Sequence, residues 1–341
     1  MHLARFPRRR YQDGPTPLEP MPRLSAELGD VELWIKRDDR TGLGGGGNKT
    51  RKLEFLVADA LERGADTLIT VGAPQSNHCS LTAAAAAHEG LACRLVIEER
   101  VAGSYADDAV GNRILFDLFG VEAITVVPAG TDMQAMMERE ADAVRADGRT
   151  PYLVPGGGSN ALGSLGYAAC AFETLQQAYE RGVAFDAWVC ASGSGGTHAG
   201  LVAGLHAASA DLPVMGISTR AERTAQEAKI RDLAAAACAH AGLASAPSAD
   251  AVTVRGDQVG PGYSLPTEPM RDAIGLFART EGLLLDPVYT GKAAAGLIAM
   301  VREGAFATGS RVLFFHTGGS AALHAYPEQV RPARGATVQR S

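Results

Sequence analysis

The sequence lacks a long apolar segment, an excess of positive charge and any closely spaced pair of cysteines. Its net charge of −6 at pH 7 argues against nucleic acid as a partner. No apolar run approaches a membrane span, and the arginines at 8–10 precede no apolar region, so we expect no membrane partner and no export signal. The cysteines lack metal-ligand spacing, which predicts a metal-free, reduced, cytoplasmic chain: Cys79, Cys93, Cys170, Cys190 and Cys238.

Lysine is also scarce. Only five of the 32 basic residues are lysine, and the other 27 are arginine. Two of the five, Lys49 and Lys52, follow a run of four glycines at 44–47. Arginine stays protonated in proteins, whereas a lysine can be tuned into a base or an imine-forming amine. The pattern favours a functional lysine here, and biased codon usage with two surface charges is the alternative that composition leaves open.

Strand-like and helix-like segments alternate along most of the chain. The strand-like segments lie at 66–72, 91–99, 121–127, 150–155, 185–192, 213–218 and 310–319. Such alternation is typical of α/β proteins whose mostly parallel sheets are covered by helices. The length of 341 residues is sufficient for two cores. We therefore expect an α/β fold of two closely packed lobes with mostly parallel, twisted sheets, followed by a loose tail after about Pro327.

The segment from Leu43 to Phe55, LGGGGNKTRKLEF, changes from glycine to a helical pattern at Lys49. Apolar residues then recur at helical spacing, at Leu53, Leu56, Val57, Ala60 and Leu61. Lys49 therefore lies in the first helical turn, where burial and the positive end of the helix both lower a lysine pKa. Glycines allow close approach of the backbone to a ligand. A purely structural turn would have the same composition.

A second glycine-rich helix start occurs at 191–200, ASGSGGTHAG. Backbone N–H groups at such a position form a cradle for anions, phosphate in particular. No Gly-Lys-Ser/Thr follows, and His198 occupies the third glycine position of a dinucleotide fingerprint, so a monophosphate ester fits better. We interpret His198 and His206 as helix residues rather than metal ligands. The match to G-x-G-x-x-A at 156–161 is interpreted as accidental, within a turn that crosses between the lobes.

Several polar residues follow strand-like segments and are candidates for a ligand cleft. Ser76 is a natural helix N-cap, which is the structural explanation for it. Open α/β sheets also bind ligands at the carboxyl ends of their strands, where Ser76, Asn77 and His78 would lie. Tyr263 and Tyr289 occur in loops rich in glycine and proline, where either function or packing would explain them.

Together, these motifs resemble the pyridoxal-phosphate (PLP) enzymes of fold type II, which are similar in architecture to the tryptophan synthase β subunit. Within that group the chain looks like the branch of aminocyclopropane-carboxylate (ACC) deaminase, D-cysteine desulfhydrase and L-cysteate sulfo-lyase. The motifs occur in the same order along nearly the whole chain: ARFPR (4–8), PTPLE (15–19), WIKRDD (34–39), GGNKTRKLEFL (46–56), QSNH (75–78), GSGGTHAG (193–200), DPVYTGK (286–292) and HTGG (316–319).

The resemblance implies an organisation and a cofactor. Residues 1–50 and 167–341 would form a larger PLP-binding lobe, and residues 51–166 a smaller lobe. The active site would lie in the cleft between them. Relatives of this kind imply a homodimer that acts on a small amino acid.

The resemblance also implies a role for each matching residue. Lys49 would form an imine with PLP and remove the Cα proton of the substrate. Asn77 would bind the 3-oxygen of PLP and Thr317 would approach its pyridine nitrogen, while the phosphate would be held by Gly193, Ser194, Gly195, Gly196 and Thr197. The substrate would meet Ser76, Asn77, His78, Ser80, Tyr263 and Tyr289. Of these, Ser76 and the two tyrosines join Lys49 as expected catalytic residues.

Two departures from the family pattern bear on the reaction. Thr290 stands where the deaminase pattern has a glutamate, so the pyridine ring is a weaker electron sink and β-elimination is favoured over ring opening. The segment CSLTAAA (79–85) replaces a usual arginine and glutamine, and the smaller Cys79 and Ser80 would leave room for a sulfonate.

We therefore expect a carbon–sulfur lyase that converts L-cysteate to pyruvate, sulfite and ammonia. The alternative is a D-cysteine desulfhydrase that releases pyruvate, hydrogen sulfide and ammonia. An ACC deaminase, a non-catalytic small-molecule-binding relative and an unrelated oxidoreductase are less favoured.

Overall fold

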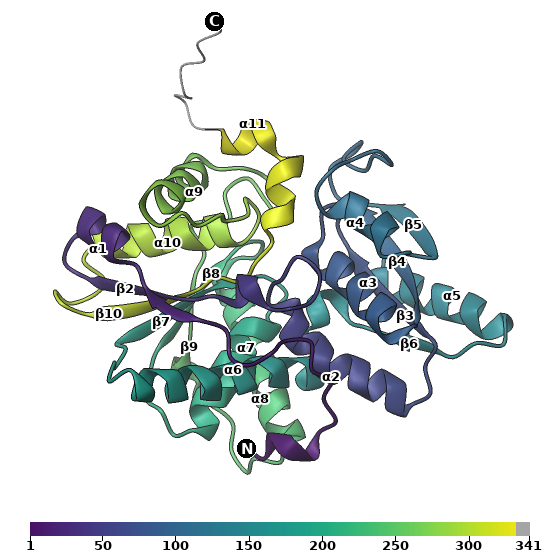
Figure 1. Ribbon diagram of the computed structural model, residues 1–341, viewed down its shortest axis with the longest axis horizontal. Helices are drawn as coiled ribbons and strands as arrows, with labels where there is room; N and C mark the ends of the chain where they lie inside the picture. The colour runs from purple at the N-terminus through teal and green to yellow at the C-terminus, as the bar shows by residue number, and fades with distance from the viewer. Residues whose placement is uncertain (332–341) are drawn as a thin grey trace, which may run out of the picture.

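The computed structural model describes residues 1–331, which form two sheets surrounded by helices (Figure 1). The strands are β1 Leu18–Pro20, β2 Glu32–Lys36, β3 Thr67–Gly72, β4 Ala92–Glu99, β5 Ala123–Pro128, β6 Pro151–Leu153, β7 Ala187–Ser192, β8 Val214–Ser218, β9 Val252–Arg255 and β10 Arg311–Phe315. The α-helices are α1 Pro22–Leu28, α2 Lys49–Glu62, α3 Asn77–Glu89, α4 Asn112–Leu118, α5 Met133–Ala146, α6 Ala161–Glu180, α7 Gly196–Ala207, α8 Arg223–His240, α9 Glu268–Glu281, α10 Thr290–Arg302 and α11 Pro327–Val330.

The two sheets are mostly parallel. The six-stranded sheet has the order β1-β2-β10-β7-β8-β9, in which only β1 is antiparallel to its neighbour. The four-stranded sheet has the order β5-β4-β3-β6 and is parallel throughout. The predicted α/β fold with mostly parallel sheets covered by helices is confirmed.

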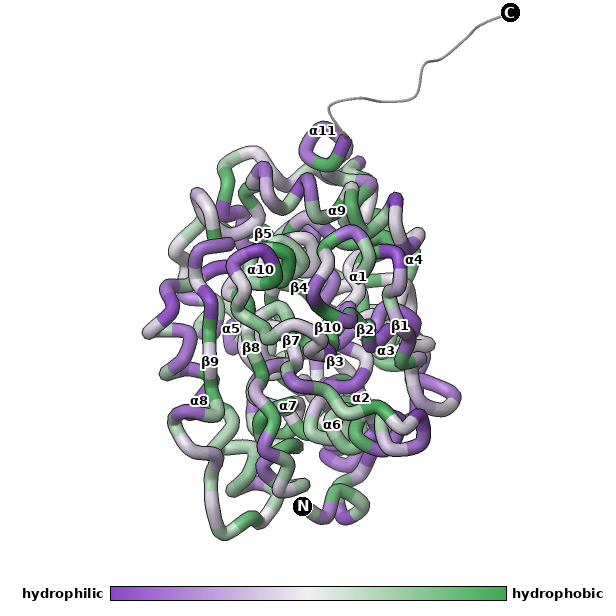
Figure 2. The backbone as a smooth tube through the Cα atoms, turned by 90° about the vertical axis from the view of Figure 1, so that its left-hand side faces the viewer, coloured by the Kyte–Doolittle hydropathy of each residue, from purple (hydrophilic) through white to green (hydrophobic). Residues whose placement is uncertain are grey.

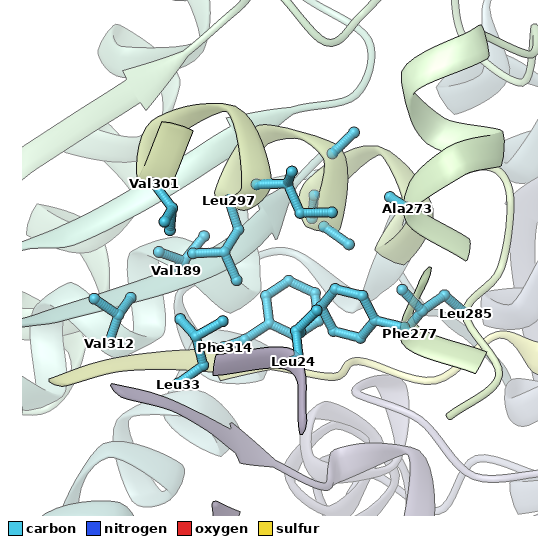
Figure 3. Close-up of a cluster of buried hydrophobic side chains, with 14 of the residues drawn as sticks. Leu24, Leu33, Val189, Ala273, Phe277, Leu285, Leu297, Val301, Val312 and Phe314 are labelled. Atoms are coloured by element: carbon cyan, nitrogen blue, oxygen red, sulfur yellow. The ribbon is translucent and has the colours of Figure 1, made fainter. Parts of the chain in front are cut away.

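The six-stranded sheet is buried on both faces. Helices α1, α9 and α10 cover one face, and α6, α7 and α8 cover the other (Figure 1). Successive side chains of a strand point to opposite faces, so Val189 joins the first core while Trp188 and Cys190 join the second. Figure 3 shows the first core, where Phe277 of α9 packs against Phe314 of β10. Burial on both faces explains the continuous apolar runs of these strands.

The four-stranded sheet forms a smaller lobe with its own cores. Leu68 and Leu95 pack against α2 and α3 on one face, and Ile69 packs against Met137 and Val144 of α5 on the other. In Figure 2 the hydrophobic segments run through the interior, and the peripheral turns are mostly hydrophilic. This division into two sheets follows the predicted lobes, whose exact boundaries stay a prediction.

Helix α2 connects the two lobes and is held firmly at its start. Its residue Leu53 packs into the smaller lobe, whereas Phe55 packs against Leu165 of α6. Arg51 is completely buried, and its guanidinium lies 2.8 Å from carboxylate oxygens of both Asp38 and Glu173. Since a buried charge needs such partners, this network anchors the N-terminal turn of α2.

Some elements differ from the sequence prediction. Strands β1, β2 and β9, each of three to five residues, were not among the strand-like segments predicted from the sequence. Order extends into the predicted loose tail, since Pro327–Val330 forms α11; the rest of that tail, from 332, lies outside the described residues. Among the described helices, none has the length and apolar character required to cross a membrane.

Candidate active site

A cavity of about 370 Å³ lies between the two lobes. Its wall includes Gly72 at the end of β3, Gly193 just after β7 and Thr317 just after β10. It therefore lies at the carboxyl ends of parallel strands from both sheets, where ligands bind in open α/β folds.

Lys49 is the first residue of α2, as predicted, and its amine reaches the cavity. Nζ donates a hydrogen bond to Asn48 Oδ1 at 2.8 Å and lies 5.8 Å from the centre of the Tyr289 ring. Burial lowers the pKa of the Lys49 ammonium to about 8, although the nearby Asp286 carboxylate opposes this change. A substantial fraction of the amine is therefore neutral at physiological pH.

The glycine run before Lys49 is required by close backbone packing. A β-carbon at Gly46 would lie 2.0 Å from Asp39 O, and the glycine has a φ of 77°. A β-carbon at Gly47 would lie 2.7 Å from the side-chain amide of Asn77. The glycines thus bring the start of α2 against the start of α3.

The loop Gly193–Thr197, which leads into helix α7, has three backbone features that suit a phosphate. Helix α7 begins at Gly196, and its N-cap residue Gly195 has no side chain to cap it. Gly195 has a φ of 104°, which L side chains rarely adopt. A β-carbon at Gly193 would lie 2.9 Å from the Tyr289 ring, so this wall of the cavity has room only for glycine. An uncapped helix N-terminus lined by glycine is an anion-binding arrangement.

Three residues near this loop were not identified as site residues from the sequence. Lys52 Nζ donates to Gly157 O at 3.0 Å and would lie 3.0 Å from a β-carbon at Gly196. Burial and the charges of Lys49 and Lys229 hold the pKa of Lys52 well below its usual range, so a phosphate dianion beside it would restore its charge. Ser159 Oγ accepts the Gly196 N–H at 3.1 Å. The scarcity of lysine was the one sequence signal for Lys52 and Lys229.

The segment 155–163 has a second role besides the predicted turn. Gly156 and Gly157 line the cavity, and Ser159 Oγ lies 2.8 Å from Ser194 Oγ in the phosphate-type loop. No dinucleotide-type strand-to-helix turn occurs here, because Gly156–Gly158 forms a 3-10 turn before α6.

Helix α3 presents Ser76, Asn77 and His78 to the cavity, as predicted. Ser76 is its N-cap, and its Oγ accepts the Cys79 N–H at 3.1 Å. The Thr70 hydroxyl donates to Val154 O, so His78 Nε2 must donate to Thr70 Oγ1, 2.8 Å away. Burial holds the pKa of His78 well below its ordinary value, and the ring is neutral.

The placement of Ser80 in the substrate site is corrected by the structure. Its side chain is 1% exposed, its hydroxyl donates to Asn112 Oδ1 at 2.8 Å, and it does not line the cavity. Cys79 is likewise fully buried beneath Gly72. Both residues lie in the first turn of α3, and their side chains are buried in the smaller lobe. The argument that they leave room for a sulfonate therefore fails.

Tyr263 and Tyr289 meet in the cavity. Their hydroxyl oxygens are 2.5 Å apart. The Asp286 carboxylate accepts the backbone N–H of Tyr289 at 2.8 Å and the Thr290 hydroxyl at 2.7 Å. Asp286 therefore positions Tyr289, and Thr290 is fully buried against Asp286 rather than exposed to the cavity.

The remaining predicted residues are placed as follows. Thr317 lines the cavity, its carbonyl accepts the Asn48 N–H at 3.0 Å, and Asn48 Nδ2 donates to Thr197 Oγ1 at 2.8 Å. Gly196 lies behind the cavity wall. In residues 1–331 there is no group of three or more residues with metal-ligating side chains, and His198 bonds Ser192 and Val214 within the core.

These residues fit PLP. The Lys49 amine, whose pKa is lowered to about 8, bonds Asn48, and Asn48 bonds Thr197 of the glycine loop suited to a phosphate. An imine-forming lysine and a phosphate cradle are the two attachments that this cofactor needs.

Comparisons with known proteins agree with this site. Residues 10–318 match the family model described as pyridoxal-phosphate dependent enzyme. D-cysteine desulfhydrases of Salmonella typhimurium and Salmonella typhi are each 46% identical over 331 residues, which covers 96% of this chain and 99% of theirs. That name matches the alternative reaction expected from the sequence rather than the preferred one.

Solved structures are also similar. The structure described as an ACC deaminase homologue has a TM-score of 0.87 and 36% identity, and the match covers 96% of both chains. O-ureido-L-serine synthase has a TM-score of 0.63 at 18% identity, with 90% of each chain covered, and shows the fold alone. The chain belongs to the family of pyridoxal-phosphate-dependent enzymes, in the branch of D-cysteine desulfhydrase and ACC deaminase.

Proposed function

We propose that the protein is a carbon–sulfur lyase that removes the β-sulfur group of a cysteine-type amino acid and releases pyruvate and ammonia. D-cysteine is the first candidate substrate, because the relatives with 46% identity over nearly the whole chain carry the name D-cysteine desulfhydrase. The observation that supports an elimination is the amine of Lys49, with a pKa of about 8, in the same cavity as the ring of Tyr289, whose hydroxyl meets that of Tyr263.

The reaction follows from what each group can do. Bound PLP would draw away the electron pair that remains on Cα after proton removal. Neutral Lys49 takes the proton from Cα, since a base works best when its pKa is near the operating pH. The Cβ–S bond then breaks, with its electron pair leaving on sulfur. The released aminoacrylate reacts with water to give pyruvate and ammonia.

The other cavity residues bind the substrate and assist departure of sulfur. The positive end of α3, at Ser76 and Asn77, suits the substrate carboxylate. Burial and the neighbouring Tyr263 raise the pKa of Tyr289 well above its ordinary value. Tyr289 therefore stays protonated and can donate to the departing sulfur atom.

L-cysteate, preferred from the sequence alone, is the second candidate. Because Ser80 and Cys79 face away from the cavity, they no longer support it. The observation in its favour is a pair of arginines beside Tyr263, Arg100 and Arg220, which would suit a sulfonate.

Assays of pyruvate from both enantiomers of cysteine and cysteate, and of 2-oxobutanoate from ACC, test the proposal. D-cysteine should have the largest kcat/KM, with one sulfide released per pyruvate. Tyr289→Phe should reduce kcat roughly 10²-fold, whereas Tyr179→Phe, at an exposed site on α6, should have no effect. If ACC is the best substrate, the protein is a deaminase and the proposal is wrong. The homodimeric and cytoplasmic states stay predictions, and sedimentation velocity tests the first.

A further inference from the structure

Two guanidinium groups flank the Tyr263 ring at the side of the cavity. Arg100 lies just beyond β4 in the smaller lobe, with its guanidinium carbon 4.4 Å from the ring centre. Arg220 follows β8 in the larger lobe, with the corresponding distance 5.9 Å. Both line the cavity with Glu98, the one acidic residue in its wall. The two lobes thus bring two positive charges to one aromatic ring.

Most donors of these arginines lack a partner. Arg100 uses Nε to bond Glu98 Oε2 at 2.5 Å, and neither of its Nη atoms meets an acceptor among residues 1–331. Arg220 has no hydrogen bond or ion pair within the same residues. Glu98 therefore orients Arg100 and leaves the outer edge of its guanidinium available. Glu98, Arg100 and Arg220 together have a net charge of +1.

These arginines lie close to the position of the reacting atoms. Tyr263 bonds Tyr289, whose ring centre is 5.8 Å from Lys49 Nζ. Burial raises the pKa of Tyr289, and the charge of Arg100 offsets part of that rise, so Arg100 is within electrostatic reach of the tyrosine hydroxyls.

The other anions of the reaction have their own partners. The phosphate would be held by the start of α7 with Lys52 and Lys229, because Lys229 Cε would lie 3.7 Å from a β-carbon at Gly195. The α-carboxylate has the start of α3. The phosphate and the α-carboxylate therefore both have binding groups other than the arginines beside Tyr263.

We propose that Arg100 and Arg220 bind a negatively charged substituent on the β-carbon of the substrate. The substrate class is then alanine with an anionic β-sulfur group, such as a sulfonate or an S-sulfo group, in addition to a thiol that leaves as an anion. A guanidinium presents parallel N–H donors that match the oxygens of such groups. Positive charge where sulfur departs also favours the breaking of the Cβ–S bond.

This proposal rests on the proposed elimination, and β-chloroalanine separates the two. The chlorine substituent of β-chloroalanine is neutral, so this substrate measures the elimination without an anionic substituent on the β-carbon. The experiment measures kcat/KM for both enantiomers of cysteate, S-sulfocysteine and β-chloroalanine with the holoenzyme. Arg100→Gln should lower the values for the anionic substrates roughly 10- to 100-fold, as expected for loss of a charge-assisted hydrogen bond. The value for β-chloroalanine should fall much less, because its substituent carries no charge until it begins to leave.

Control variants complete the test. Arg100→Lys should retain part of the activity toward anionic substrates, and Arg139→Gln, an exposed arginine on α5, should change nothing. Arg220→Gln should act like Arg100→Gln and leave PLP affinity unaltered. Equal losses for β-chloroalanine and cysteate, no loss for either, or weaker PLP binding by Arg220→Gln would each overturn the proposal. Failure of the wild-type enzyme to process β-chloroalanine would instead contradict the lyase itself.

Discussion

Two of the helix N-termini at the cavity, those of α7 and α3, differ in the groups that surround them. Helix α7, in the larger lobe, starts in glycines and has no side-chain cap. Helix α3, in the smaller lobe, starts at a serine whose hydroxyl accepts the Cys79 N–H. At the first, glycines surround the backbone donors and Ser159 of another segment accepts the Gly196 N–H, whereas the second surrounds its donors with its own side chains, Ser76, Asn77 and His78.

The difference indicates that the two helix starts bind different groups. Bare backbone donors and the helix dipole bind an anion strongly but recognise little else, which suits a cofactor phosphate that stays in place. A helix start with side chains can also discriminate shape and move protons, which suits a substrate that changes. Lys49, at the start of α2, is the third helix N-terminus in the cavity and lies between the other two.

The largest expected effect is at the third helix start. Lys49→Ala removes the imine-forming amine and the base, so turnover should fall by roughly 10³-fold or more. The absorption band of the PLP imine should also disappear. Lys52→Ala should retain that band and weaken PLP binding instead, because its amine lies behind the phosphate-type loop. The assignment is wrong if the two phenotypes are exchanged.

The pH dependence of cofactor binding follows from the same lysine. Only the neutral amine attacks PLP, and the Lys49 pKa is lowered to about 8. The rate of imine formation by the apoenzyme should therefore rise about tenfold per pH unit below pH 7 and level off above pH 8. Stopped-flow absorption between pH 5.5 and 10.5 measures this. A rate that continues to rise toward pH 10 would show an ordinary lysine pKa.

Adding one methyl group at the start of α7 tests whether this glycine-lined helix start binds the cofactor phosphate. Gly196→Ala would place a β-carbon 2.8 Å from Ser159 Oγ and 3.0 Å from Lys52 Nζ. We expect PLP affinity to fall roughly 10-fold by displacement of phosphate-binding groups. Gly45→Ala is the matched control, because a β-carbon there meets open space. Equal PLP dissociation constants for the two soluble variants would contradict the phosphate cradle.

The smallest effect is expected at the capped helix. Ser76→Ala should lower the free energy of unfolding by about 1 kcal/mol through loss of the cap, and should also reduce kcat/KM. Asp132→Ala removes the cap of α5 in the same lobe, outside the cavity wall. It should cause a similar loss of stability with no kinetic change. If the two variants are equally active, Ser76 is a structural cap alone.

The helix starts themselves were predictable, because each depends on residues next to one another in the chain. The change from glycine to helical spacing at Lys49, the cap at Ser76 and the glycines at 193–196 are all local patterns. Their order along the chain was specific enough to indicate the family and the cofactor. Ser80 was misplaced because it lies near Ser76 in sequence, yet its side chain is buried and its hydroxyl donates to Asn112, a contact that only the tertiary structure shows.

The sequence by itself therefore determined the α/β fold and predicted the positions of the cavity lysine and the glycine loop, since local backbone preference and apolar periodicity are encoded within short segments. The tertiary structure alone decided which distant charges line the cavity or lie directly behind its wall. Lys52, Lys229, Arg100 and Arg220 come from separate elements and carry no common motif. They come close together because the carboxyl ends of strands from both sheets lie at one cleft. No local sequence pattern predicts that arrangement.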